Sequence, residues 1–362
     1  MITINKEIDI DITYIEKRYP DINKVLFFDI ETTGFSYKKN MIYLIGCTYF
    51  VDNKPFIIQW LSENENDEYN ILHNFINFSK DYNQLIHFNG TSFDIPFITN
   101  RASFYTLEFD ITNYDSIDIY KLVRPCKHIL NLNNCKQKTI EQYLNIYRED
   151  KFSGGELIDR FIAFLKTGNT ILKTILLKHN EDDIIGLTKI LNIHEHIDFY
   201  NCMKQQNLLY TINKVNYTTS TMDIYLKTNN ICPFTYNQTN QYYCIDLNNE
   251  SIFIKISLLE DELKYYFKNY KDYYYIKSED EAVHKQVAKY INKKNKTKAT
   301  RENCYIKKRG IFIPLPDSYI IENEQIFNSS IKENTNYLLL KENIFNDNIF
   351  ILKLCNNILS NL

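Results

Sequence analysis

The sequence predicts an α/β protein of two domains: a mixed sheet with flanking helices, followed by a C-terminal α+β accessory domain. At 362 residues the chain is long enough for two domains. Three strand-like runs between residues 25 and 61 have short connections, as in an antiparallel meander, and helix and strand patterns then alternate to residue 193. Near residue 200 the chain becomes rich in Tyr and Thr with strand-like alternation. We therefore expect domains at 1–203 and 204–362.

Apolar spacing predicts the elements of the first domain. After a lead-in over residues 1–20, Val25–Phe28 is a short continuous apolar run, which is typical of a strand buried on both faces. Tyr114–Val123 is either a strand that runs into a helix or a strand alone. Further strands are expected at Met41–Phe50, Pro55–Leu61 and Gln84–Phe88, and helices at 67–78, 93–100, 139–146, 155–165 and 170–193.

The second domain carries weaker patterns. Tyr210–Ile256 alternates as strands do, and Cys304–Pro314 predicts another strand. Helix-forming residues over Glu281–Asn292 predict a helix. Tyr337–Leu340 and Ile349–Leu354 are expected to be short elements.

Composition excludes several classes of protein. The eight cysteines are scattered without a C-x-x-C pair, which argues against a zinc ribbon or a redox motif. The N-terminus lacks a secretory apolar region, and no run approaches the roughly 18 apolar residues that a membrane span needs. We therefore expect a cytoplasmic protein with reduced thiols and no membrane contact. Nothing identifies a protein partner, and we expect a monomer.

Two carboxylates follow the strand at residue 25. Asp29 and Glu31 are two positions apart, so their side chains point to the same side of a strand. Like charges at the end of a buried strand cost energy unless a cation neutralises them, and a hard divalent metal with oxygen ligands does so. The alternative is a pair of solvated carboxylates.

Three later stretches carry further acidic groups. Asp94 follows a strand and the Asn89-Gly90 turn, where it could instead cap the next helix. His179 and Asp183 are four residues apart and so share one face of the predicted helix. His179 could also be a surface histidine at a helix start. Asp115 and Asp118 end another strand, where an Asp is more often structural.

In this order the motifs resemble the DEDD superfamily of 3′→5′ exonucleases, which has a ribonuclease H-like fold, and are most similar to its YprB-type branch. DIETTG resembles the first exonuclease motif, N-x-x-x-FD (Asn89 and Phe93-Asp94) the second, and H-x-x-x-D the third. The stretch KQKTIEQYLNIYREDKFSGGELI (136–158) is also similar to that branch. The resemblance covers residues 24–195, and a weaker one continues into YYYIKSEDEAVHKQVAKYI and NCYIKKRGIFIP.

The resemblance implies a site for two metal ions, Mg²⁺ or Mn²⁺. Asp29 would bridge both ions, Glu31 and Asp183 would bind the one that activates water, and Asp94 would act mainly through a water ligand. His179 stands where many relatives have Tyr, and the His branch uses the spacing H-x-x-x-x-D instead. It therefore stays open whether His179 is a general base or only positions the water.

The same resemblance indicates where nucleic acid would bind. The turn Thr32-Thr33-Gly34 resembles the segment whose backbone holds the terminal nucleotide, and Asn89 belongs to the second motif. Phe35 could stack on a base or be a core aromatic.

Cations are concentrated in the second domain. Between Lys285 and Arg309, eight Lys and two Arg against one Glu give a local net charge of +9 in a chain of net charge −3. Such a segregated basic stretch is typical of a surface that binds phosphates, although a solvated helix face and loop is the alternative. The residues expected to contact phosphates are Lys293, Lys294, Lys296, Lys298 and Arg301.

Together these features predict a metal-dependent nuclease on single-stranded DNA or RNA, most simply a 3′→5′ exonuclease. The first alternative is a non-catalytic nucleic-acid-binding module with this fold. Four retained carboxylates argue against it, because clustered acids without a metal are a liability. The second is a glycosidase, but two carboxylates flanking a sugar fit this pattern of four acids less well than metal ions do.

Overall fold

A computed structural model describes residues 1–148, 154–316, 324–341 and 347–362 of the chain. The structure divides into two compact units, Met1–Ile197 and Asp198–Leu362. The stretch 136–158 named above includes residues 149–153, which lie outside the described residues. Within the described part of the chain, no helix is long and apolar enough to cross a membrane.

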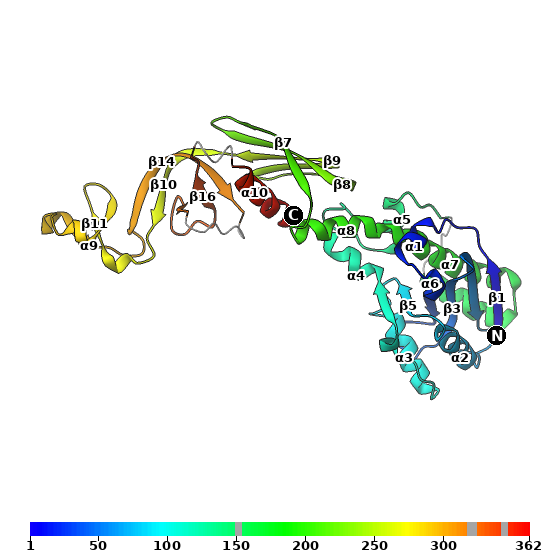
Figure 1. The fold of residues 1–362 in the computed structure, drawn as a ribbon. Coiled ribbons are helices and arrows are strands. Elements are labelled where there is room, and N and C mark those ends of the chain that lie inside the picture. The colour runs from blue at the N-terminus through cyan, green and yellow to red at the C-terminus, as the bar shows by residue number, and fades with distance from the viewer. Residues whose placement is uncertain (149–153, 317–323, 342–346) are drawn as a thin grey trace. The chain divides into compact units, whose positions relative to one another are not determined.

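A six-stranded mixed sheet forms the centre of the first unit (Figure 1). Its order is β1-β4-β3-β2-β5-β6, in which β2, β3 and β4 are antiparallel neighbours and β5 and β6 run parallel to β2. The predicted meander and mixed sheet are confirmed. The strands are β1 Ile2–Glu7, β2 Val25–Thr32, β3 Ile42–Val51, β4 Lys54–Leu61, β5 Gln84–His87 and β6 Asp115–Asp118.

Helices cover both faces of this sheet. On one face Phe28 packs with Phe75 of α2, and on the other Tyr43 stacks on Phe161 of α6 with ring centroids 4.1 Å apart. Because strand side chains alternate, Asp29 and Glu31 lie on the face opposite Phe28, toward α7. The helices are α1 Thr13–Arg18, α2 Glu68–Ser79, α3 Asp94–Phe104, α4 Ile119–Val123, α5 Gln137–Tyr143, α6 Gly154–Thr167, α7 Thr170–Lys189 and α8 Ile193–Lys204.

Two predictions for the first unit are sharpened. The lead-in over residues 1–20 contributes an edge strand, because β1 pairs antiparallel with β4. Residues 114–123 form a strand that runs directly into a helix, β6 and then α4. The side chain of Asp118 caps α4 by accepting the backbone N–H of Tyr120, which explains why the strand ends there.

The second unit is rich in β-structure. Three antiparallel sheets have the orders β7-β8-β9, β10-β14-β16-β15 and β12-β11-β13, and the helix α10 closes the chain. The elements are β7 Tyr210–Tyr217, β8 Thr221–Thr239, β9 Tyr243–Ser257, β10 Leu259–Tyr266, β11 Tyr273–Ile276, β12 Glu281–His284, α9 Lys285–Ala288, β13 Lys296–Lys298, β14 Tyr305–Leu315, β15 Ile326–Phe327, β16 Asn336–Leu339 and α10 Asn348–Ser360.

The helix predicted over Glu281–Asn292 is confirmed only over Lys285–Ala288 and is wrong at both ends, since turn and loop follow Ala288. Glu281–His284 forms the strand β12, and a short helix, Lys285–Ala288, follows. Asp280 adopts a left-handed conformation with φ 52°, which turns the chain so that β12 pairs antiparallel with the Tyr-rich strand β11. Pairing with a neighbouring strand therefore overrides a local helix preference at these positions.

Candidate metal centre

The strand β2 presents the first two acidic side chains. Asp29 and Glu31 lie on one face, as the period of two requires, and Gly46 of β3 is the antiparallel partner of Asp29. The pairing register shifts between Glu31 and Thr32, so the regular ladder ends where the carboxylates are.

The helix α7 brings the third motif onto that face. Asn180 donates from Nδ2 to Asp29 Oδ2 at 3.1 Å, and its own Oδ1 accepts from Gln59 at 2.9 Å. A Cβ at Gly46 would overlap Asn180 Oδ1 and the end of Ile184, so the glycine allows α7 to lie directly against the sheet. One turn of α7 therefore lies beside the end of β2.

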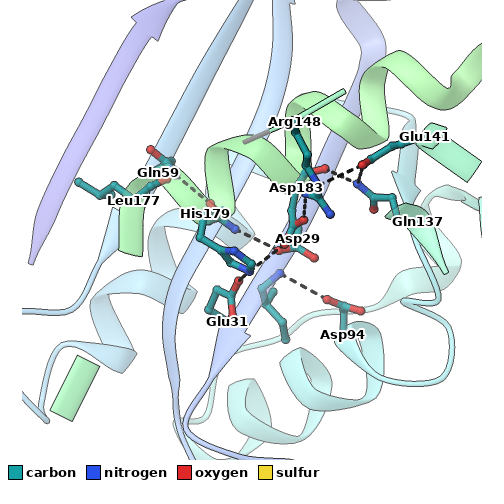
Figure 2. A network of polar contacts seen from close by, with 12 residues as sticks. Asp29, Glu31, Gln59, Asp94, Gln137, Glu141, Arg148, Leu177, His179 and Asp183 are labelled. Carbon is teal, nitrogen blue, oxygen red and sulfur yellow. Dashed lines mark hydrogen bonds and ion pairs between the residues drawn. The ribbon is translucent and has the colours of Figure 1, made fainter. Parts of the chain in front are cut away.

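His179 joins the two elements (Figure 2). Its Nε2 lies 3.4 Å from Glu31 Oε1 and 3.1 Å from Asp183 Oδ2. One ligand atom from each of these three residues lies within 4.8 Å of the others, close enough for a single ion to contact all three. The predicted shared face of His179 and Asp183 is confirmed.

Asp94 is the first residue of α3, and its side chain contacts the backbone of β2. It is buried, and its Oδ1 accepts the backbone N–H of Ile30 at 3.3 Å. The turn before it is held by Asp118, whose oxygens accept the backbone N–H groups of Asn89 at 2.8 Å and Thr91 at 3.2 Å. Asp118 thus has the structural role that a strand-end Asp favours, and it fixes the loop that leads to Asp94.

The carboxylates have pKa values that differ in direction. Burial raises the pKa of Glu31 to about 8, to which Asp183 and Asp94 contribute and which His179 opposes. Burial also raises the pKa of Asp94 to about 7. Burial, together with the charges of Asp94, Glu31 and Asp183, raises the pKa of Asp29 well above its ordinary value. For Asp183, burial is outweighed by His179 and Arg148, so its pKa is lowered.

The donor set fits hard divalent ions. Three acids whose pKa values are raised by burial and by neighbouring carboxylates are an arrangement that a cation would stabilise. The ligand atoms that these acids, Asp183 and His179 offer are carboxylate oxygens and one imidazole nitrogen, which suit Mg²⁺ or Mn²⁺ better than sulfur-preferring metals. Asp29, Glu31, Asp94 and Asp183 are the residues that would hold the ions.

The sequence did not predict the group behind Asp183. Arg148 donates from Nη1 to Asp183 Oδ1, and its Nε lies 3.0 Å from Glu141 Oε2. Gln137 donates to Glu141 at 2.9 Å and to the backbone carbonyl of Asp183 at 2.7 Å (Figure 2). No motif spacing connects α5 with α7, so only the packing of the two helices reveals these contacts.

The predicted nucleotide-binding turn follows β2 directly. Thr33 and Met41 exchange hydrogen bonds across it, at 3.0 and 3.1 Å, and Gly34 has φ 153°, a conformation that favours glycine. Thr32 donates its hydroxyl to the Gly34 carbonyl at 2.9 Å. The side chain of Phe35 is 92% exposed, so the alternative of a core aromatic is wrong.

The five residues predicted to contact phosphates lie on β13 of the small sheet β12-β11-β13 and on the segments beside it. Lys293, Lys294, Lys298 and Arg301 are exposed. Lys296 is partly buried, donates to the Ala288 carbonyl and lies with its Nζ 5.3 Å from the centre of the Tyr274 ring. Lys296 therefore contributes to the packing of this sheet, whatever else it binds.

A mixed sheet of this order, with a strand-end carboxylate pair and a helix that completes the cluster, defines a ribonuclease H-like domain. Residues 26–194 match the RNase_H_2 family model, which is described as RNase H superfamily. The predicted ribonuclease H-like fold is confirmed. The match reaches the superfamily, and the YprB-type branch stays a prediction.

Other comparisons add little. No curated protein matches the chain. Among solved structures it is similar to a family B DNA polymerase from the hyperthermophilic archaeon Pyrobaculum calidifontis, with 10% identity, a TM-score of 0.42 and coverage of 93% of this chain and 45% of the polymerase. The chain thus spans less than half the length of that polymerase.

Proposed function

We propose that this protein is a divalent-metal-dependent nuclease that hydrolyses phosphodiester bonds of single-stranded nucleic acid, releasing nucleotides from the 3′ end. The observation that carries the proposal is the convergence of Asp29, Glu31, Asp94 and Asp183, from three separate segments, beside His179. A fold of the RNase H superfamily around this cluster supports it.

In the proposed reaction the four carboxylates would bind metal ions, and His179 would act on the attacking water. Bound ions would activate a water and stabilise the leaving oxygen as it gains charge. Asp29 and Glu31 would hold the ions from the sheet, and Asp94 and Asp183 would hold them from α3 and α7. His179 offers Nε2 between Glu31 and Asp183, where it can orient the attacking water or accept its proton.

The turn after β2 would bind the terminal nucleotide. Phe35 is exposed, and its ring lies edge-to-face with Phe93, 6.2 Å between centroids, directly before Asp94. An exposed aromatic beside the cluster is suited to stack on a base, a contact worth about 1–3 kcal/mol. Asn89 and the backbone of Thr33 and Gly34 lie on the flanking loops and are proposed to contact the sugar and phosphate.

Asp183→Asn tests the proposal. Single-stranded DNA and RNA labelled at the 3′ or the 5′ end are incubated with Mg²⁺, Mn²⁺ or EDTA. We expect metal-dependent release of the 3′ nucleotide by the wild-type chain, and a loss of at least about a hundredfold in Asp183→Asn, because the ions lose a ligand.

Asp182→Asn is the matched control. Asp182 precedes Asp183 on α7, but its Oδ1 pairs with Lys178 Nζ at 2.7 Å. The activity of the Asp182→Asn variant should therefore equal that of the wild type. Equal activity of Asp183→Asn would overturn the site assignment. Binding of nucleic acid without any cleavage would favour the non-catalytic binding module, and release from the 5′ end would overturn the polarity.

A further inference from the structure

A partly buried guanidinium contacts Asp183 of the candidate metal centre. The side chain of Arg148 is 12% exposed and bridges two acids: Glu141 of α5, through Nε, and Asp183 of α7, through Nη1 (Figure 2). The side chain of Glu141 is 2% exposed, so this anion is held in the interior beside its cation. A partly buried Arg between two carboxylates is held in place, because breaking the contact with Glu141 leaves a buried carboxylate without its cation.

The surrounding packing is built around this bridge. Gln137 donates to both Glu141 Oε1 and the carbonyl of Asp183. Gly186 lies one turn after Asp183 on α7, and a Cβ there would overlap Glu141 Oε1. The helix α5 therefore lies against the turn of α7 that carries the acidic residue, and a glycine makes the approach possible.

The two carboxylate oxygens of Asp183 have different partners. Oδ1 accepts from Arg148, whereas Oδ2 lies 3.1 Å from His179 Nε2, on the side of Glu31. An oxygen that accepts from a guanidinium is a poor second ligand for a metal, and a fixed positive charge nearby repels an incoming cation.

We propose that Arg148 is a positioning residue of the metal centre: it holds Oδ1 of Asp183 away from the ions, leaves Oδ2 as the single metal-facing oxygen, and lowers the affinity of the centre for divalent cations. This inference rests on the proposed function. Arg148 then has opposite effects on metal affinity and on kcat: its charge weakens metal binding, while its contact with Asp183 keeps that carboxylate oriented for the reaction.

Titration of Mn²⁺ into the metal-stripped full chain, followed by calorimetry, measures the first quantity without reference to activity. We expect Arg148→Gln to lower the Kd for Mn²⁺ by roughly tenfold, because a charge next to the site is removed. We expect kcat for release of the 3′ nucleotide to fall by roughly tenfold with KM unchanged, because Asp183 is no longer oriented. Arg148→Lys keeps the charge, and its Kd should stay within about threefold of the wild type.

Two further variants make the result unambiguous. Arg148→Gln leaves the buried carboxylate of Glu141 without its cation. The double variant Glu141→Gln/Arg148→Gln removes both charges of the pair. We expect it to fold and to bind Mn²⁺ more tightly than the wild type does. Lys178→Gln makes the same charge change on α7 at a lysine that pairs with Asp182, and should leave the Kd unchanged.

An unchanged or raised Kd in the folded Arg148→Gln or double variant would overturn the inference. A lowered Kd in Lys178→Gln as well would overturn it too, because a general charge effect would then account for the result. Wild-type protein that binds no Mn²⁺ would overturn the proposed function itself, and this outcome is visible before any variant is compared.

Discussion

At the scale of single residues, Glu31 and Asp94 ionise only at a raised pH, and a bound cation would favour their ionised form. The pKa of Glu31 lies at about 8 and that of Asp94 at about 7, whereas an unfolded chain ionises both near pH 4. Between about pH 4 and pH 8 the folded protein therefore keeps protons that the unfolded chain has lost. These two carboxyl groups therefore stabilise the folded protein less as the pH rises through this window, whereas His87, whose pKa burial lowers to about 4, acts in the opposite direction below about pH 6.5.

The first prediction concerns this pH dependence. In EDTA the melting temperature of the protein should decrease from about pH 6.5 to pH 8, because His87 is neutral in the folded and unfolded states there and each unit of raised carboxyl pKa costs about 1.4 kcal/mol once the group ionises. With Mg²⁺ or Mn²⁺ the decrease should be smaller, since the ions stabilise the ionised acids and binding releases their protons. Thermal melts across this pH range, with and without metal, measure both effects.

Glu31→Gln provides the control for this experiment. A neutral amide at this position removes the carboxyl group whose pKa burial raises to about 8, so the pH dependence in EDTA should become shallower. A wild-type melting temperature that rises with pH in EDTA would show that the centre is not an uncompensated cluster of acids. A metal-induced shift that is equal at pH 5 and pH 8 would contradict the linkage.

At the scale of elements, the centre depends on how closely α7 approaches the sheet. Gly46 lies opposite Asp29 on β3, and its missing side chain makes room for Asn180 and Ile184. This approach is what brings His179 to Glu31. A glycine inside an otherwise apolar strand is a signal of close approach that the sequence does carry.

Gly46→Ala should therefore push α7 away from β2. We expect a loss of about 1–3 kcal/mol in the free energy of unfolding, as for other overpacked interiors, and a fall of at least tenfold in kcat, because Asp183 moves relative to Asp29. Chemical denaturation and cleavage kinetics below both melting temperatures measure the two effects separately.

Gly155→Ala is the matched control for the alanine substitution. Gly155 lies in α6, and a Cβ there would meet nothing within 4 Å, so we expect unchanged activity and equal or higher stability. Wild-type activity in Gly46→Ala would mean that the spacing of α7 and β2 does not limit the reaction.

The elements also explain what the sequence could predict. The shared face of Asp29 with Glu31, and of His179 with Asp183, could be predicted because strand and helix periods fix which side chains point the same way. Arg148 was missed because no local period relates a loop after α5 to α7. The strand β12 was missed because its pairing with β11 depends on a turn at Asp280, while its composition favours a helix.

Over the whole molecule, charge is separated between the two units. All residues of the candidate metal centre belong to the first unit, Met1–Ile197, whereas the basic stretch from Lys285 to Arg309, of net charge +9, belongs to the second. We propose that the second unit holds single-stranded nucleic acid by its phosphates while the first unit cleaves it. Hydrolysis of a very short substrate would then not need the second unit.

The last prediction separates these two activities. Replacing the exposed Lys293, Lys294 and Lys298 with Ala should weaken binding of a long single strand and flatten its salt dependence by up to about 2 in the slope of log K against log salt, at about 0.7 per phosphate contact. KM for a long strand should rise while kcat on a dinucleotide stays unchanged.

The control triple variant Lys227→Ala, Lys255→Ala and Lys341→Ala removes lysines of the same unit that pair with acids at 3.4, 3.9 and 2.9 Å, and should bind as the wild type does. Equal salt slopes for both triple variants and the wild type would place phosphate binding outside the basic stretch.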